Sequence, residues 1–223
     1  LVDKNKKKVV FNSKKFLPSV VILDPSLMET LNIKQLGYSL MDILAHSLEA
    51  LVSKKSNPLS DSFALESIRL IIENYESVKE PYSHKILEKI SVAGFLGGLS
   101  QNLASVGLVH ALSHYFGSKY KIPHSKAISL FLIPVIEFNI SKTGKYGKLD
   151  SFKTISEKDV IDNINKIKKY FQIADEYLEL EDDLNKQEII TTIKRDMCII
   201  TNPIMPSDDE LISIINKITR KKE

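Results

Sequence analysis

The order of apolar and polar positions predicts a chain that is helical over most of its length. After residue 26, apolar residues recur every three or four positions, the spacing that places them on one face of an α-helix. The predicted helices cover approximately residues 27–32, 34–54, 60–76, 82–107, 107–116, 125–140, 156–173, 185–200 and 207–220. We therefore expect a mainly α fold, a helical bundle domain with a short extended N-terminal lead-in.

The first 26 residues follow a different pattern. The runs "KKVVF" (7–11) and "SVVIL" (19–23) are short and rich in β-branched residues, which is typical of strands. Two strands alone are marginally stable in water, so we expect them to complete a sheet formed elsewhere. The sequence thus predicts a lead-in at 1–26 and an all-helical domain at 27–223.

Single residues predict where some helices begin, bend or end. Ser207 followed by Glu210 is a capping box, which marks the start of a helix. Gly117 is placed to end a helix, and Pro134 should kink or interrupt one. The stretch 141–148, "SKTGKYGK", is predicted to be a loop.

Composition narrows the class of protein. The chain is 43% hydrophobic and 26% charged with a net charge of +3, as in ordinary globular proteins. The apolar run 128–136 is far shorter than the ~20 residues of a membrane span. A single cysteine, Cys198, excludes an internal disulfide and suits a cytoplasmic setting. The basic clusters at 4–8 and 220–222 have no interleaved aromatics, so we expect no nucleic-acid partner and no membrane.

The candidate metal-binding residues lie in two apolar segments that contain histidines. In "MDILAHSLEA" (41–50), Asp42 and His46 are four residues apart, and His110 and His114 repeat that spacing on another helix. His124 starts a third apolar helix. Because a buried carboxylate needs a cation, the two pairs could meet around one divalent metal, for which aspartate and histidine suit Fe²⁺ or Zn²⁺. Alternatively, these are core histidines bonded to backbone carbonyls.

Two further polar residues have less definite roles. Glu49 lies one turn beyond His46 and would either support a ligand histidine or form a surface ion pair. His84 lies in the polar turn "EPYSHK" and is expected at the surface.

At these residues the sequence resembles the iron-containing (group III) alcohol dehydrogenase family. The resemblance rests on "MDILAHSLEALVSKKSNPLSDSFALESIRLI" and "GLVHALSHYFGSKYKIPHSKAISLFLIPVIEFN", and flanking matches extend it over essentially the whole chain. It implies that the metal ligands are Asp42, His46, His110 and His124. It also implies that His114 is the additional histidine near the substrate, which assists catalysis or proton movement. A serine, Ser125, replaces the glycine that usually follows the last ligand in the family.

The resemblance implies a function as well. Family members are NAD(P)-linked dehydrogenases, here expected as a homodimer, that use Fe²⁺ or Zn²⁺ to oxidise a small alcohol or reduce an aldehyde or ketone. Their NAD(P)-binding α/β domain has no counterpart in this chain, and its first residue, Leu1, is not a methionine. We therefore expect the chain to begin just after that domain, and to bind metal without dehydrogenase turnover on its own.

Two other classes of function stay open at this level. One is a metal-binding helical module without a redox role, or a degenerate homologue. The other is a metal hydrolase, which would need a general base in the site. His114 and Glu49 are the residues available for that role.

Overall fold

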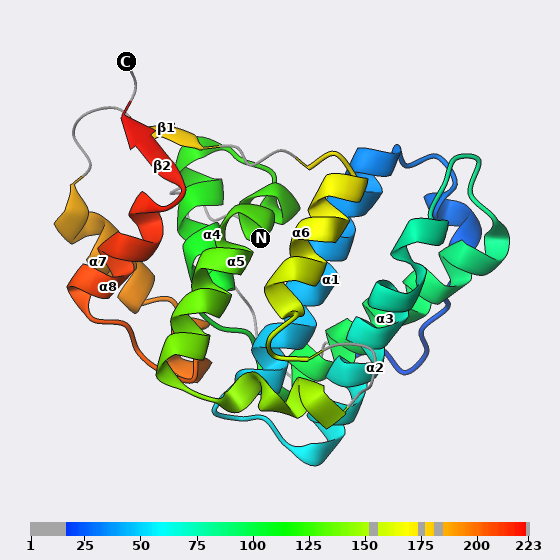
Figure 1. Cartoon of the computed structure of the whole chain (residues 1–223), viewed down its shortest axis with the longest axis horizontal. Coiled ribbons are helices and arrows are strands. Elements are labelled where there is room, and N and C mark those ends of the chain that lie inside the picture. Colours follow the sequence, from blue (N-terminus) through cyan, green and yellow to red (C-terminus); the bar gives the residue numbers. More distant parts are fainter. Residues whose placement is uncertain (1–16, 152–155, 174–176, 181–184, 222–223) are drawn as a thin grey trace.

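A computed structural model describes residues 17–151, 156–173, 177–180 and 185–221. Its elements form a helical bundle with one very small sheet (Figure 1). In chain order they are η2 (Pro25–Met28), α1 (Ile33–Val52), α2 (Pro58–Asn74), η3 (Tyr75–Ser77), α3 (His84–Ala104), α4 (Leu108–Tyr120), α5 (His124–Lys142), η4 (Lys145–Ser151), α6 (Val160–Tyr170), β1 (Leu178–Leu180), α7 (Lys186–Lys194), η5 (Ile199–Thr201), α8 (Asp208–Asn216) and β2 (Thr219–Lys221). The expected mainly α bundle is confirmed.

Helix α1 is the central element of the bundle. It lies between α2 and α3 on one side and α4 and α5 on the other (Figure 1), and it also contacts α6. Leu40, Met41 and Leu44 are at most 1% exposed, and each such side chain contributes about 1.5–3 kcal/mol by burial. A polar side chain on this helix is therefore surrounded by other helices and needs a partner there.

Local signals set several helix starts, one of which was predicted. Asn32 caps α1, where its side chain accepts a hydrogen bond of 2.8 Å from the backbone N–H of Gln35. Ser207 and Glu210 form the predicted capping box at the start of α8. These contacts satisfy backbone N–H groups that the first turn of a helix leaves without partners.

Two local predictions were wrong and a third was wrong in part. Helix α4 continues past Gly117 to Tyr120, and Lys121 ends it with a left-handed φ of 54°. Pro134 lies inside α5 without interrupting it, and the kink that it was expected to cause stays a prediction. The loop predicted at 141–148 is largely helical, because α5 extends to Lys142 and η4 begins at Lys145. In each case, packing against the core outweighs the local tendency of these residues to end or interrupt a helix.

The sequence pattern also missed a pair of strands. Strands β1 and β2 are parallel, with Leu178 opposite Thr219. Arg220 of β2 places its guanidinium 3.5 Å from the ring centroid of Tyr177. Runs of three residues are too short to show alternation, which explains why they were not recognised.

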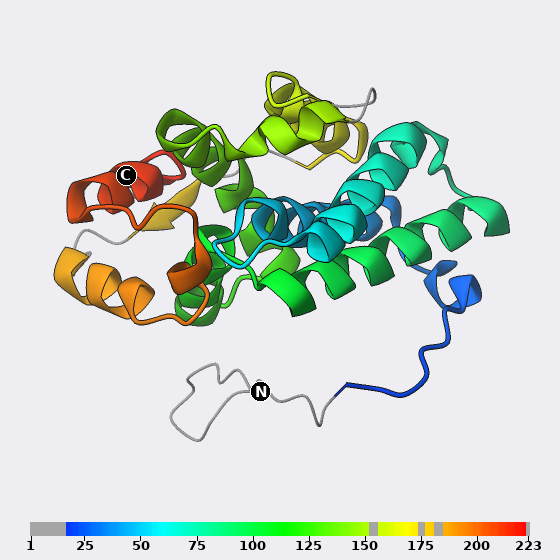
Figure 2. The ribbon, with the colours of Figure 1, turned by 90° about the horizontal axis from the view of Figure 1, so that it is seen from below.

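The described part of the lead-in is irregular rather than a strand in a sheet. Residues 17–24 contain no strand, and Val20 and Ile22 are 76% and 86% exposed. Figure 2 shows this segment leaving the helical body toward the N-terminus. The other predicted strand, at 7–11, lies outside the described residues. The division at residues 26 and 27 stays a prediction.

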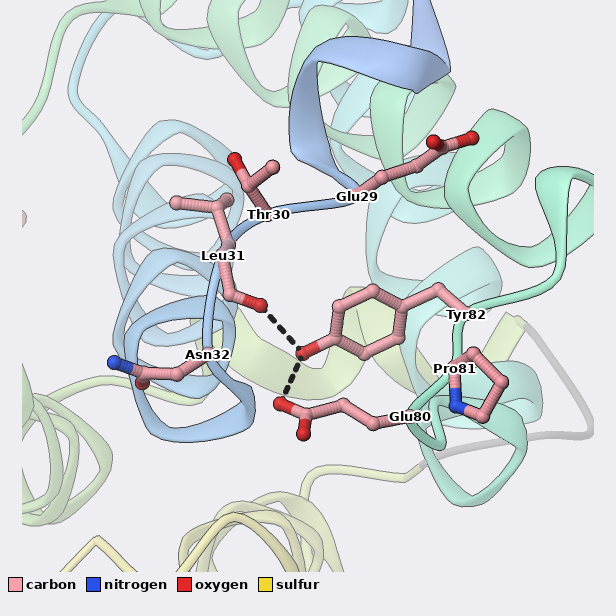
Figure 3. Close-up of a pocket in the computed structure, with 7 residues that line it drawn as sticks. All are labelled: Glu29, Thr30, Leu31, Asn32, Glu80, Pro81 and Tyr82. Carbon is pink, nitrogen blue, oxygen red and sulfur yellow. Dashed lines mark hydrogen bonds between the residues drawn. The ribbon is translucent and has the colours of Figure 1, made fainter.

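A surface hollow of about 620 Å³ lies between residues 29–32, just ahead of α1, and residues 80–82, just ahead of α3 (Figure 3). The hydroxyl of Tyr82 donates to the carbonyl of Leu31 at 2.9 Å, and the backbone N–H of Ile33 donates to Glu80 at 2.8 Å. These bonds tie the start of α1 to the loop before α3. None of the predicted metal ligands lines the hollow.

Among the described residues, no single helix is long and apolar enough to cross a membrane. Helices α3 and α4 would pass such a test only as a pair, and the chain bends by 104° between them.

Candidate metal centre

Three helices bring the predicted ligands to one place. Helix α1 provides Asp42 and His46, α4 provides His110 and His114, and His124 is the first residue of α5. The contacts of α1 with α4 and α5 place these side chains together, although they are up to 82 positions apart in the chain. His84 is exposed at the start of α3, as predicted, and takes no part.

Oδ1 of Asp42 is the centre of the group. The Nε2 atoms of His46, His110 and His124 lie 3.6, 3.7 and 3.8 Å from it. This oxygen is buried and accepts no hydrogen bond from the described residues. Those distances are too long for hydrogen bonds, so the arrangement leaves a buried carboxylate oxygen facing three imidazole nitrogens.

The spacing fits a small divalent cation. Ligand atoms about 2.1 Å from a tetrahedral zinc ion lie roughly 3.4 Å apart, close to the separations seen here. Ligand atoms of Asp42, His110 and His124 all lie within 4.8 Å of one another. His46 lies outside that mutually close set, although its Nε2 is near Asp42. A cation between these atoms would balance the carboxylate charge that burial makes costly.

The rings of His46 and His110 stack, and a positive charge on His46 is disfavoured. The rings of His46 and His110 are 4.8 Å apart and inclined by 19°. Burial, reinforced by His110, lowers the pKa of His46 to about 3. The neutral imidazole that results is the form that coordinates metals.

Glu49 contacts Nδ1 of His110. Its Oε2 lies 2.6 Å from Nδ1 of His110, while its Oε1 accepts a 2.6 Å hydrogen bond from the backbone N–H of Val109. Burial raises the pKa of Glu49 to about 7, although hydrogen bonds from backbone N–H groups, including that of Val109, oppose the rise. A carboxylate that holds Nδ1 of a histidine fixes the ring so that Nε2 faces the metal. Of the two roles left open for Glu49, the structure shows the contact with His110 and not an ion pair at the surface.

Gly107 makes the approach of Glu49 possible. A Cβ atom at this position would lie 3.0 Å from Oε1 of Glu49 and 2.8 Å from Oδ1 of Asn202. Asn202 in turn accepts a hydrogen bond of 3.2 Å from the N–H of Leu108. The N-terminus of α4 is therefore capped by side chains from α1 and from the C-terminal region, with no side-chain cap of its own.

His114 has a hydrogen-bond partner that was not predicted from the sequence. Its Nδ1 lies 2.9 Å from Oδ2 of Asp196, in the turn that follows α7. Burial raises the pKa of Asp196, but hydrogen bonds from His114 and from the N–H of Cys198 outweigh it, and the net pKa is lowered. The ring of His114 stacks against that of His124 at 5.8 Å. The contact with Asp196 orients the imidazole beside the predicted ligands.

Asp196, Asn202 and Gly107 could not be recognised from periodicity. Asp196 and Asn202 lie in irregular segments far along the chain from α4, where no repeating pattern points to a partner. Glu49 carried a weak signal, because it continues the stripe of Asp42 and His46 at seven residues.

Comparison with known proteins identifies the family. A model of the Fe-containing alcohol dehydrogenase family, C-terminal, matches residues 37–219. The 1,3-propanediol dehydrogenase of Citrobacter freundii is 36% identical over 151 residues, which are 67% of this chain and 39% of that protein. The NAD-dependent methanol dehydrogenase of Bacillus methanolicus is 28% identical over 219 residues, 90% of this chain and 56% of that protein.

The fold agrees with that of a solved relative. The iron-containing alcohol dehydrogenase of Thermococcus thioreducens superposes with a TM-score of 0.80 at 26% identity, covering 94% of this chain and 57% of that one. The chain thus spans about half the length of that enzyme. The match of the family model to most of the sequence, together with this superposition, means that the chain belongs to the Fe-containing alcohol dehydrogenase family.

Proposed function

We propose that this chain holds the catalytic metal of an NAD(P)-linked alcohol dehydrogenase that interconverts a small alcohol and its aldehyde or ketone. The observation that supports this most is the buried Oδ1 of Asp42, with three histidine nitrogens 3.6–3.8 Å away. The proposed ligands are Asp42, His46, His110 and His124. A nicotinamide dinucleotide is proposed as the hydride carrier by analogy with the methanol dehydrogenase relative, whose name states NAD dependence.

The protein residues have separate roles in this proposal. A divalent cation in this position, Fe²⁺ or Zn²⁺, supplies Lewis-acid chemistry that polarises an alcohol or carbonyl oxygen. Asp42 provides the negative charge of the site, and Glu49 holds the ring of His110 by its Nδ1. Within a dehydrogenase, the hydride chemistry itself belongs to the nicotinamide.

His114 is the proposed proton carrier. Because Asp196 holds its Nδ1, the other ring nitrogen, Nε2, is left to exchange a proton with the substrate hydroxyl. The ring lies beside His124, so a substrate bound at the metal would be close to it. A pair made of an imidazole and an orienting carboxylate is a common arrangement for acid–base catalysis.

Metal analysis tests the first half of the proposal. Protein purified without chelators, or stripped and reloaded anaerobically with Fe²⁺ or Zn²⁺, should retain metal at this site. Asp42→Ala and His124→Ala should each reduce the metal bound there. Unchanged metal content in both variants would refute the ligand assignment.

Activity tests the second half. The protein, expressed together with whatever its gene encodes ahead of Leu1, should reduce NAD⁺ or NADP⁺ with small primary alcohols. His114→Ala should lower kcat while leaving the metal bound by Asp42, His46, His110 and His124 unchanged. Full metal binding without any alcohol-dependent reduction of either cofactor would favour the non-catalytic metal-binding module instead.

We also propose that the 223-residue chain alone binds the metal but does not turn over. NAD(P)H oxidation with an aldehyde by this chain would contradict that proposal. Homodimer formation stays a prediction drawn from the family, and a cytoplasmic location stays one drawn from the single cysteine. Sedimentation of the purified protein tests the dimer directly.

A further inference from the structure

A second group of metal-binding side chains lies next to the first. Ligand atoms of His114, Asp196 and Cys198 all lie within 4.8 Å of one another. None of the three belongs to the proposed ligand set of Asp42, His46, His110 and His124. We propose that His114, Asp196 and Cys198 form a second divalent-metal site, selective for thiolate-binding cations such as Zn²⁺, Cd²⁺ or Co²⁺.

The donor set matches such a cation in type and in charge. Imidazole nitrogen, carboxylate oxygen and thiolate sulfur are the three kinds of ligand that zinc takes in proteins. One thiolate and one carboxylate balance a dication, while the imidazole stays neutral. This balance matters because all three side chains are partly buried, where an uncompensated charge is costly. The thiolate also distinguishes this site from the first one, whose donors are nitrogen and oxygen.

The backbone around the cluster is held in place by hydrogen bonds. The N–H of Cys198 donates to Oδ1 of Asp196 at 2.8 Å, which fixes the turn that carries both residues. Thr201 donates to the carbonyl of Val106, just ahead of α4. Asn202 accepts from Leu108, the first residue of α4. The turn is thereby anchored to the helix that carries His114, so the three donors meet without a loop having to close.

The contact between His114 and Asp196 shows where the cation would enter. Nδ1 of His114 and Oδ2 of Asp196 lie 2.9 Å apart, within hydrogen-bonding distance. A metal that binds both atoms and the sulfur would displace the proton of the thiol, while the neutral imidazole would carry its single proton on Nε2. Three protein ligands leave a fourth position for water, as in open zinc sites.

One consequence rests on the proposed function. If His114 exchanges the proton with the substrate, a cation on its Nδ1 competes with the orientation that Asp196 provides. Excess zinc should then inhibit the dehydrogenase, with relief by Cys198→Ser. Metal binding at the second site can be measured without activity, so its failure and the failure of the proposed function are distinguishable.

Cobalt titration of the metal-free 223-residue chain provides the direct test. Cys198 is the only cysteine in the sequence, so a thiolate-to-cobalt charge-transfer band in the near ultraviolet can arise only from this residue. We expect that band to appear on binding of Co²⁺ and to be absent in Cys198→Ser. Asp42→Ala should lose the first site and retain the band.

Two further variants distinguish a metal site made by all three residues from cobalt binding by the Cys198 thiol alone. His114→Ala and Asp196→Asn should each weaken the cobalt affinity measured at this band by roughly tenfold or more. Far-ultraviolet circular dichroism of both variants checks that the helices are intact. A missing band in the folded parent chain would overturn the proposal. An affinity that neither substitution changes would overturn it equally, since the thiol would then act alone.

Discussion

Oε2 of Glu49 lies 2.6 Å from Nδ1 of His110, and both side chains are at most 5% exposed. The same carboxylate accepts a hydrogen bond from the N–H of Val109 at the start of α4. One side chain of α1 therefore both positions a proposed metal ligand and caps the helix that carries it. In the proposed site, metal affinity and helix packing are therefore linked through this residue.

Substituting Glu49 should weaken metal binding more than it disturbs the fold. Glu49→Gln keeps the size of the side chain and one acceptor for Val109, but it removes the charge facing His110. We expect a loss of roughly tenfold to a hundredfold in affinity for Zn²⁺, measured by competition with a chelating dye. Glu88→Gln, at an exposed position of α3, is the matched control. Equal affinities for the two variants would contradict this role.

Asp42→Asn should separate metal binding from the stability of the metal-free protein. Because Oδ1 of Asp42 accepts no hydrogen bond from the described residues, loss of its charge should cost the metal-free protein little stability or none. The rise in Tm that Zn²⁺ produces should be largely lost, since that rise reports binding to the folded state. Thermal denaturation with and without zinc measures both effects, with the exposed Asp162→Asn as control. An unchanged zinc-dependent rise in Tm would exclude Asp42 as a ligand.

Gly107→Ala should destabilise the protein because the space is already filled. Its Cβ would come within 3.0 Å of Glu49 and 2.8 Å of Asn202, so at least one of these residues must move. The expected loss is about 1–3 kcal/mol, measured by urea denaturation. In contrast, Gly98→Ala in α3 meets nothing within 4 Å and should stabilise its helix by about 0.5–1 kcal/mol. Similar effects at both positions would show that helix propensity, rather than contact with Glu49, governs Gly107.

The capping box of α8 should make the stability of the protein depend on pH in the acid range. Hydrogen bonds from Lys142 and from the N–H of Ser207 lower the pKa of Glu210 below its ordinary value of 4.5. A lowered pKa in the folded state means that the contribution is complete above about pH 4.5 and is lost as the pH falls through the folded-state value. The Tm of Glu210→Ala should therefore be lower than that of the parent at pH 7, and the difference should shrink below pH 4. A difference that stays constant across this range would assign the effect to packing.

The sequence by itself determined the class of fold and most of the candidate site. Periodicity of three and four residues predicted the helices, because burying one face of a helix demands apolar residues at that spacing. Asp42 and His46, like His110 and His114, are pairs within single helices, so their spacing alone placed each pair on one face. His124 at the start of α5 also followed from local signals, since it comes directly after Pro123.

The tertiary structure alone decided how those residues are supported. Asp196 meets His114 across 82 positions, and Asn202 meets Leu108 across 94. Such contacts depend on how α4 packs against α1, α7 and the C-terminal turn, and local sequence carries no record of that geometry. The same holds for Gly117 and Pro134, where local preferences of about 1–3 kcal/mol are smaller than the sum of core packing around α4 and α5. Spacing within a helix is encoded locally, whereas contacts between helices arise from the packed core as a whole.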